Sequence, residues 1–440
     1  MQAGGKILYT NIGNPHSVGQ KPLTWPRQVM ALVDLPAEVG VDHPAAATLF
    51  PADAIARAKE IQAALGGGTG AYSHSKGNTL FRHDVVEFIQ NRDNLPSDPE
   101  SIFLTNGAST GISHILTTVI SGPNDGCMIP IPQYPIYSAT LAMLNGAQVP
   151  YNLDESKGWS CTLSGLEESL AAAKAKGITT KAFVIINPGN PTGQVLDESS
   201  LQDVCSFCAK HGLVLLADEV YQENVYTDAK KFVSCKKAAS DAGVLDKLQM
   251  ASFHSTSKGI FGECGRRGGY MELTGFNPEV VDEIYKLASS SLCSGLAGQV
   301  MTSLMCRGPS PGDASYDSHE LEKATIFNSL KNRAKIVAEG LNAIDGFTCN
   351  PAEGAMYVFP RVEIPAGAIA AAKAAGTSPD GLYAMSLLEE TGICVVPASG
   401  FGQEEGRVGF RTTFLPSSEE MQEGVKKMKE HHEMFVKRYQ

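Results

Sequence analysis

Lys181-Ala-Phe-Val-Ile-Ile186 leads directly into Asn187-Pro-Gly-Asn-Pro-Thr-Gly193. A continuous apolar run of this kind is typical of a strand in a parallel sheet whose two faces are both covered. The prolines and glycines that follow predict a fixed loop at the C-terminal end of that strand. Helical spacing at residues 201–210 and a second apolar run at residues 213–217 repeat the pattern. This alternation of strand and helix predicts a doubly wound α/β domain.

A similar unit stands earlier in the chain, where the apolar run at residues 101–105 precedes Asn106-Gly-Ala-Ser-Thr-Gly111. Apolar residues then recur at helical spacing from Ile112, so a helix is expected to start in this turn. The free N–H groups of a helix start bind anions, so this turn is a candidate anion site. The alternative is an ordinary turn between a strand and a helix, because small residues fit a phosphate but do not require one.

This turn also matches the Gly-x-Ser-x-Gly elbow of the α/β hydrolases, a different class of enzyme. In that alternative Ser109 is a nucleophile, with Asp218 and His254 completing a triad. The hydrolase interpretation leaves the loop at residues 187–193 and Lys258 without a role.

Lys258 lies in Ser252-Phe-His-Ser-Thr-Ser-Lys-Gly259, and Arg266 and Arg267 follow closely. A lysine held in a pocket beside cationic groups loses its proton more easily and becomes a nucleophilic amine. Hydroxyl groups and an arginine nearby suit a phosphate. Pyridoxal phosphate (PLP) requires both features, because its aldehyde bonds to a lysine and its phosphate needs an anchor. The stretch suits PLP, but by itself it is more typical of a polar surface loop with a basic pair, so the rest of the chain must decide.

Asp218 follows the apolar run at residues 213–217, in Asp218-Glu-Val-Tyr221. A carboxylate at the end of a buried strand is costly unless it is paired, and its partner could be a protonated pyridine nitrogen or an arginine. Tyr134 lies next to prolines that fix its ring, which could stack on a flat cofactor. Ligand sites of doubly wound domains lie at the C-terminal ends of the strands. The residues expected to meet there are Ser109, Tyr134, Asn190, Asp218 and Lys258.

With 440 residues the chain is too long for one hydrophobic core, so two domains are expected. We predict a large domain at residues 46–316 with a doubly wound, mostly parallel sheet. A smaller α+β domain is predicted at residues 317–440. Residues 1–45 are rich in Pro and Gly, and we expect them to be largely irregular and to pack with the small domain.

The composition excludes several classes of partner. The net charge of −11 and the absence of a basic block argue against nucleic acid, and no apolar run is long enough to span a membrane. The cysteines lack framework or metal-ligand spacing, so Cys205 and Cys208 are expected to be small buried hydrophobic residues and no metal is expected. His431 and His432, in an amphipathic C-terminal helix, are expected to be solvated.

Several strings together resemble the class I/II aminotransferases of PLP fold type I, and within them the alanine aminotransferases. They are the loop at residues 187–193, Asp218-Glu-Val-Tyr221, Lys258 with Ser255 and Arg267, Arg411 with Pro416, and Asn11-Ile-Gly-Asn-Pro15. The resemblance covers nearly the whole chain. It implies the transfer of the amino group of L-alanine to 2-oxoglutarate, giving pyruvate and L-glutamate, by a ping-pong mechanism.

The resemblance also implies roles for single residues. Lys258 would hold the PLP aldehyde as a Schiff base and move a proton, Asp218 would face the ring nitrogen, and Arg411 would bind the substrate α-carboxylate. The Ile12-Gly13 backbone would close over the substrate. Tyr72 would reach the phosphate in a partner subunit, which implies a homodimer with shared sites. The other implied cofactor contacts are Ala108, Ser109, Ser255 and Arg267 with the phosphate, Tyr134 with the ring face, and Asn190 and Tyr221 with the ring hydroxyl.

Two alternatives keep PLP and change the reaction: another amino donor, or elimination by a C–S or β-lyase. A cytoplasmic location is expected, or a mitochondrion or other organelle if a presequence precedes Lys6, since family members usually carry several tens of residues before that position.

Overall fold

A seven-stranded sheet lies at the centre of the computed structural model, which describes residues 7–404 and 406–440. The strand order is β2-β8-β7-β6-β5-β3-β4, and only the pairings of β8 with β2 and β7 are antiparallel. The prediction of a mostly parallel α/β sheet is therefore confirmed. The strands are β2 (Ile102–Thr105), β3 (Asp125–Ile131), β4 (Ala147–Asn152), β5 (Thr179–Ile186), β6 (Val214–Asp218), β7 (Met250–Ser255) and β8 (Gly269–Thr274).

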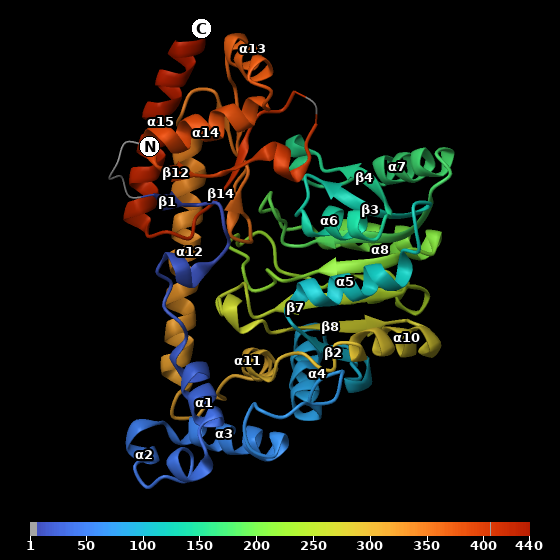
Figure 1. Cartoon of the computed structure of the whole chain (residues 1–440), viewed down its shortest axis with the longest axis vertical. Coiled ribbons are helices and arrows are strands. Elements are labelled where there is room, and N and C mark those ends of the chain that lie inside the picture. The colour runs from blue at the N-terminus through green and yellow to red at the C-terminus, as the bar shows by residue number, and fades with distance from the viewer. Residues whose placement is uncertain (1–6, 405) are drawn as a thin grey trace.

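Helices cover both faces of this sheet, and the alternation of side chains along β5 shows why its residues 182–186 are all apolar. Val184 and Ile186 pack on the face covered by α5, α6 and α10, whereas Phe183 and Ile185 pack on the face covered by α7, α8 and α9. In Figure 1 α5 and α6 lie in front of the sheet. These helices are α5 (Ala108–Val119), α6 (Ile136–Met143), α7 (Leu163–Ala175), α8 (Glu198–His211), α9 (Cys235–Asp241) and α10 (Pro278–Ser289). Cys205 and Cys208 of α8 are fully buried.

A second helical layer packs at the β2 edge of the sheet and includes a helix that the sequence analysis missed. Residues 24–34 were expected to be irregular, but they form a helix, because Trp25, Val29 and Val33 recur at helical spacing and are buried against the helices around them. The helices of this layer are α1 (Thr24–Asp34), α2 (Ala46–Leu49), α3 (Ala52–Leu65), α4 (Thr79–Asp93) and α11 (Leu296–Cys306).

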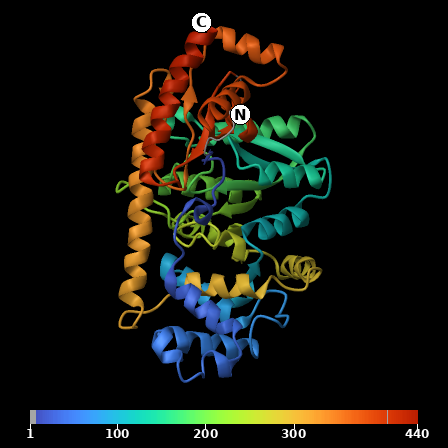
Figure 2. The same ribbon diagram turned by 60° about the vertical axis from the view of Figure 1, so that its left-hand side comes forward.

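The remaining chain begins with the long helix α12 (Tyr316–Asn342), which runs along one side of the molecule beside α15 (Figures 1 and 2). Small sheets pack around it, in the orders β10-β14-β13, β11-β9 and β1-β12. The first strand, β1, pairs in parallel with β12, so the start of the described chain joins the C-terminal part. The elements are β1 (Leu8–Tyr9), β9 (Phe347–Thr348), β10 (Tyr357–Val358), β11 (Arg361–Val362), β12 (Ile393–Cys394), β13 (Val396–Pro397), β14 (Phe410–Thr413), α13 (Ala366–Ala374), α14 (Pro379–Thr391) and α15 (Ser418–Tyr439).

The two histidines of α15 are buried, so the expectation that they are solvated is wrong. His431 Nε2 lies 3.0 Å from the hydroxyl of Ser386, and His432 Nδ1 lies 3.3 Å from the hydroxyl of Tyr383. Burial lowers the pKa of both imidazoles. The histidines belong to the apolar face of this amphipathic helix, where they pack on aromatic rings.

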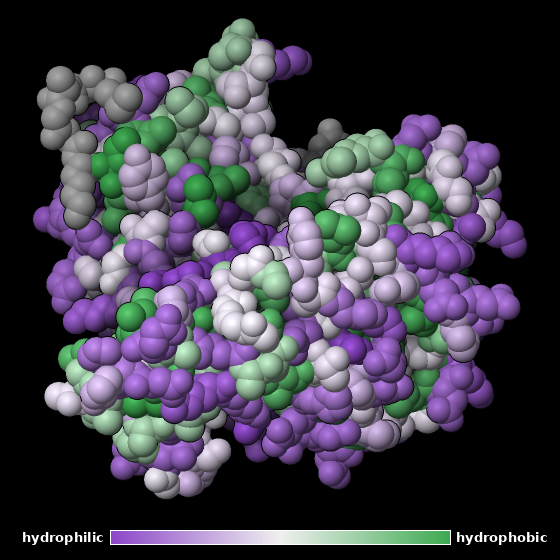
Figure 3. All heavy atoms as spheres, turned by 60° about the horizontal axis from the view of Figure 1, so that its bottom comes forward, coloured by the Kyte–Doolittle hydropathy of each residue, from purple (hydrophilic) through white to green (hydrophobic). Residues whose placement is uncertain are grey.

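Among the described residues, no helix combines the length and the apolar character that crossing a membrane requires. On the face shown in Figure 3, hydrophobic residues occur in small groups among hydrophilic ones.

Candidate active site

The C-terminal ends of the central strands open onto a cavity of about 270 Å³. Loops after β3 and β5, the ends of β6 and β7, and the start of α5 all contribute to its lining, as expected for a doubly wound sheet. Of the described residues proposed from sequence, Tyr72 and Arg411 lie outside this lining. The proposed residues that line it are Ile12, Gly13, Ala108, Ser109, Tyr134, Asn190, Asp218, Tyr221, Ser255, Lys258 and Arg267.

Lys258 follows β7, and its Nζ donates a hydrogen bond to the carbonyl oxygen of Gly13 at 2.9 Å. Burial lowers the pKa of the amine, but Tyr357, Cys264 and Tyr134 raise it, and the net pKa lies above the usual value. The sequence-based expectation of a depressed pKa is therefore wrong for the cofactor-free protein, because hydroxyl and thiol groups outweigh the nearby cation.

Asp218, at the end of β6, is buried with one oxygen paired and one without a partner. Its Oδ2 accepts a hydrogen bond from the hydroxyl of Tyr137 at 2.8 Å, whereas no group in the described chain donates to Oδ1. Burial raises the pKa of this carboxyl to about 6, against the hydrogen bonds from Tyr137 and the Val220 N–H and the charge of Lys258. An unpaired buried carboxylate oxygen is costly. The protonated ring nitrogen of PLP is the kind of donor that this oxygen lacks, so the site fits that cofactor.

The start of α5 forms an anion site together with Arg267. Gly107, the N-cap, has φ +77°, and a Cβ there would come within 2.6 Å of Arg267 Nη2, so only glycine fits. Arg267 itself has φ +54° and donates to the carbonyl of Asn106 at 2.9 Å. Its guanidinium therefore lies beside the free N–H groups of the helix, an arrangement that suits a phosphate. Arg266 does not line the cavity.

Arg411, on β14, reaches the site through Asn190. Its Nη1 donates to Asn190 Oδ1 at 3.0 Å, and its Nη2 donates to the carbonyl of Asn11 at 2.6 Å. Its Nε is buried and has no acceptor in the described chain. Asn190 Nδ2 in turn donates to the hydroxyl of Tyr221 at 3.3 Å. Asn190 thus bridges the Arg411 guanidinium and the Tyr221 hydroxyl in the cavity wall.

Three of the residues predicted for the site are exposed, and they lie at the rim of the cavity or outside it. Tyr134 is 40% exposed at the cavity, which leaves its ring accessible to a ligand. Ile12 is 60% exposed although it lines the cavity. Tyr72 is 80% exposed, as a residue that serves a partner subunit would be.

The structure adds residues to the site that the sequence analysis missed. Apolar side chains form part of the walls, and nothing in the sequence separates them from ordinary core residues. Tyr357, which contacts Tyr221 of the cavity wall without lining the cavity itself, is also missed, because it comes from β10, a part of the chain that sequence patterns do not connect with the site. The apolar residues are Ile112, Ile136, Ile186 and Val220.

The hydrolase triad is not assembled. The hydroxyl of Ser109 lies 3.4 Å from Arg267 Nη2, and Asp218 is bonded to Tyr137. His254 lies on the opposite face of the sheet, where its ring stacks on Phe88 of α4 at 6.0 Å.

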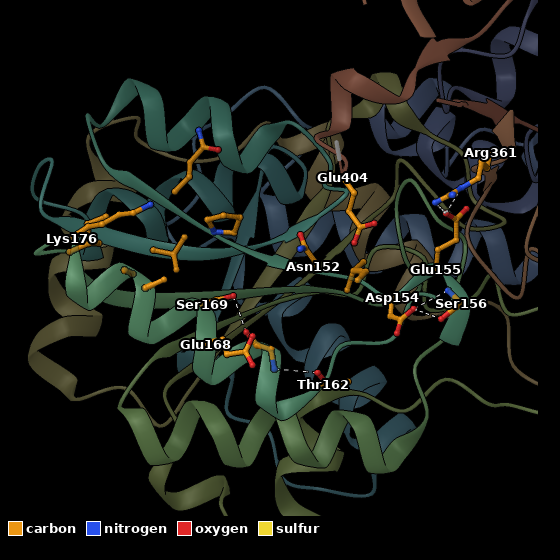
Figure 4. A pocket seen from close by; sticks show the side chains of 18 residues that line it. Asn152, Asp154, Glu155, Ser156, Thr162, Glu168, Ser169, Lys176, Arg361 and Glu404 are labelled. Carbon is orange, nitrogen blue, oxygen red and sulfur yellow. Dashed lines mark hydrogen bonds and ion pairs between the residues drawn. The ribbon is translucent and has the colours of Figure 1, made fainter. Parts of the chain in front are cut away.

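A second groove of about 690 Å³ lies along the edge strand β4 and α7 (Figure 4). Its side chains are mostly polar, and Glu155 at one end pairs with Arg361 at 3.0 Å. None of the residues predicted for the site is among the described residues that line it.

Comparison with known families decides between the remaining possibilities. The family model described as "Aminotransferase class I and II" matches residues 43–428. The chain belongs to the class I/II aminotransferase family. This aminotransferase is therefore PLP-dependent and of fold type I, and neither the hydrolase nor the lyase alternative is favoured.

Two relatives and one solved structure show how far the similarity reaches. Glutamate–glyoxylate aminotransferase 1 of Arabidopsis thaliana is 50% identical over 438 residues, covering 99% of this chain and 91% of the relative. A probable mitochondrial alanine aminotransferase of Dictyostelium discoideum is 51% identical over 436 residues, covering 99% of this chain and 81% of the relative. The solved alanine aminotransferase of Pyrococcus furiosus shares the fold, with a TM-score of 0.77, 23% identity and coverage of 98% and 93%.

Proposed function

We propose that this aminotransferase transfers the amino group of L-alanine to 2-oxoglutarate, giving pyruvate and L-glutamate in a ping-pong reaction. The observation that carries the chemistry is the unpaired Oδ1 of Asp218 in the same cavity as Lys258 and the anion site of α5. Relatives of about 50% identity that are named alanine aminotransferases support the choice of substrate.

Each residue has a task in this proposal. When bound, PLP supplies an electron sink for the bond electrons released at the substrate α-carbon. Asp218 would face the ring nitrogen and keep it protonated, and Arg267 with the start of α5 would hold the phosphate. Lys258 Nζ would take the proton from the substrate α-carbon. Arg411 would bind the α-carboxylate, and its Nε is a donor that lacks an acceptor among the described residues.

A second candidate is the transfer from glutamate to glyoxylate, favoured by the Arabidopsis relative. Both reactions use a dicarboxylic partner and a small one, so kcat/KM for alanine with 2-oxoglutarate should be compared with that for glutamate with glyoxylate. A higher value for the first pair supports the proposal, and a higher value for the second replaces it. If the PLP-bound protein catalysed neither reaction, both candidate functions would be rejected. Lys258→Ala is the matched blank, because it removes the reacting amine.

We also propose a homodimer in which Tyr72 contacts the phosphate in the partner's site. The 80% exposure of this tyrosine supports the idea. Lys258→Ala and Tyr72→Ala should each be nearly inactive, but a reassembled mixture should regain activity, because one site of the mixed dimer then has both native side chains. A monomer by sedimentation, or no recovery on mixing, contradicts the shared site.

The domain division at residues 46–316 and 317–440 remains our proposal, and the start of α12 at Tyr316 supports it. For residues 1–45, the proposed packing with the second part holds where β1 pairs with β12, whereas α1 packs with α3 and α11 of the first part, because its apolar face is buried there. Limited proteolysis should cut the stretch at residues 307–315 first. We propose a cytoplasmic location, which a fluorescent fusion would test against the mitochondrion named for the Dictyostelium relative.

A further inference from the structure

Tyr357, on β10, lies next to Gly13 and Tyr221 of the cavity wall. Its side chain is buried, and its hydroxyl accepts a hydrogen bond from the hydroxyl of Tyr221 at 3.1 Å. The Lys258 amine lies close to this hydroxyl, beside the same Gly13, and its charge lowers the pKa of the phenol. A Cβ on Gly13 would overlap the Tyr357 hydroxyl and lie 3.1 Å from Lys258 Nζ. The Tyr357 hydroxyl and the Lys258 amine therefore both lie against Gly13, where no side chain would fit.

The ring of Tyr357 makes a separate contact. The guanidinium carbon of Arg411 lies 4.3 Å from the ring centre, so the cation stacks on the aromatic face. Such stacking fixes the plane of the guanidinium and, with it, the direction of the unpaired Nε. One side chain thus touches the proposed proton carrier with its hydroxyl and the proposed carboxylate anchor with its ring.

We propose that Tyr357 is a positioning residue of the active site, whose hydroxyl holds the Lys258 amine and whose ring holds Arg411. The inference rests on the proposed function, which gives the amine and the guanidinium their tasks. Because the hydroxyl and the ring act on different groups, the two effects can be separated by substitution.

The electrostatics agree with the geometry. Burial lowers the pKa of Lys258, but Tyr357 is the largest of the influences that raise it. Burial raises the pKa of Tyr357, but Lys258, Arg411 and the hydrogen bond from Tyr221 outweigh burial and lower it. Loss of the phenol should therefore lower the pKa of the amine. The other titratable or charged groups that face this pair are Asp218, Tyr134, Tyr221, Cys264 and Arg411.

Tyr357→Phe removes the hydroxyl and keeps the ring. The full-length, cofactor-free protein is labelled with a trace of acetic anhydride over a series of pH values, and acetylation of the Lys258 peptide is followed by mass spectrometry. The midpoint should move to lower pH by about one unit, a tenfold gain of free amine at a fixed lower pH. An unchanged midpoint would overturn the proposal. This readout needs no turnover, so it remains decisive even if the proposed substrates prove wrong.

Tyr226→Phe is the matched control. Tyr226 is also buried, and its hydroxyl donates to the carbonyl of Ala355 at 2.7 Å and accepts from Asn224 at 2.9 Å, but the cation that acts on it is Arg333 and not Lys258. This variant should lose thermal stability to a similar extent and leave the labelling midpoint of Lys258 unchanged. A midpoint that moves equally in both variants would mean a general effect of losing a buried hydroxyl, which contradicts the assigned contact.

Kinetics separate the ring from the hydroxyl. Tyr357→Phe should lower kcat about tenfold or more, displace its pH profile and leave KM for the amino acid nearly unchanged. Tyr357→Leu should in addition raise that KM, because Arg411 then keeps only Phe401 of the two rings on which its guanidinium stacks. A Tyr357→Phe enzyme with native kcat and pH profile, or a Tyr357→Leu enzyme with native KM, would overturn the corresponding half of the proposal.

Discussion

Arg411 donates a hydrogen bond from Nη1 to Oδ1 of Asn190 at 3.0 Å, which joins the last strand of the C-terminal sheets to the loop after β5. This contact orients the guanidinium while leaving its Nε free for a ligand. The arginine proposed to bind the substrate carboxylate is thereby placed beside the cavity that we propose for the cofactor.

The first prediction concerns the planar fork of Arg411. Arg411→Lys keeps the charge but cannot reproduce the bond to Asn190 together with two-point binding of a carboxylate. We expect kcat/KM for amino acids to fall by about 10- to 100-fold, since a hydrogen bond to a charged group contributes roughly 1.5–3 kcal/mol. Initial-rate kinetics check this. Arg438→Lys, at an exposed arginine paired with Glu390, should behave like the native enzyme. An Arg411→Lys enzyme with native kcat/KM would remove this residue from substrate binding.

The second prediction concerns the carboxylate of Asp218. Asp218→Asn leaves the ring nitrogen without a buried anionic partner, a loss of roughly 3 kcal/mol or more. We expect kcat to fall by about 100-fold or more. Glu219→Gln is the control, because Glu219 is equally buried but accepts its hydrogen bond from the Cys235 N–H, away from the cavity. If both variants lost kcat equally, the special role of Asp218 would be disproved.

The third prediction is that the same substitution stabilises the cofactor-free protein. The pKa of Asp218 is raised by burial from 3.8 to about 6, so the folded state binds more protons than the unfolded state between these values. Stability from this group is thus present below pH 3.8 and is lost as pH rises through 6, at a cost of about 3 kcal/mol. Cofactor-free Asp218→Asn should melt at a higher temperature than the native chain at pH 8, and the difference should vanish near pH 4. Calorimetry of both proteins at both pH values tests this prediction. Equal melting temperatures for the variant and the native chain at pH 8 would contradict a destabilising buried charge at Asp218.

The fourth prediction concerns acid stability. Burial lowers the pKa of His254 to about 3, and both ring nitrogens lack partners among the described groups. The unfolded state therefore takes up a proton first as pH falls below 6.5, and the stability associated with the neutral imidazole is lost progressively towards pH 3 by up to a few kcal/mol. His254→Phe should flatten the decline of the melting temperature between pH 6.5 and 4. His83→Gln, at an exposed histidine, should not, and equal slopes in all three proteins would exclude His254 as a source of acid sensitivity.

Much of the fold was predictable, because apolar strands and amphipathic helices alternate and each pattern has its own period. The gathering of Tyr134, Asn190, Asp218 and Lys258 follows from the same rule, since parallel strands carry their loops to one edge. The position of a residue along a strand also decides on which face of the sheet its side chain lies, and therefore whether it can reach the cavity. Ser255 lines the cavity, and His254, one residue earlier, necessarily points to the other face. That alternation alone argued against the triad.

Contacts between distant segments could not be predicted. Tyr357 meets Lys258 only because the C-terminal sheets fold against the large sheet, and no local pattern records that approach. The raised pKa of the lysine depends on the same neighbours. The sequence predicts solvated side chains for His431 and His432, because no partner residue stands at a suitable spacing, whereas their aromatic neighbours in the fold bury them.

The bond from Arg411 to the Asn11 carbonyl joins residues that are 400 positions apart. During synthesis on the ribosome, the strands that line the cavity emerge long before Arg411. A chain that ended prematurely before Arg411 would therefore still contain Lys258 but would lack the residue that we propose binds the substrate carboxylate.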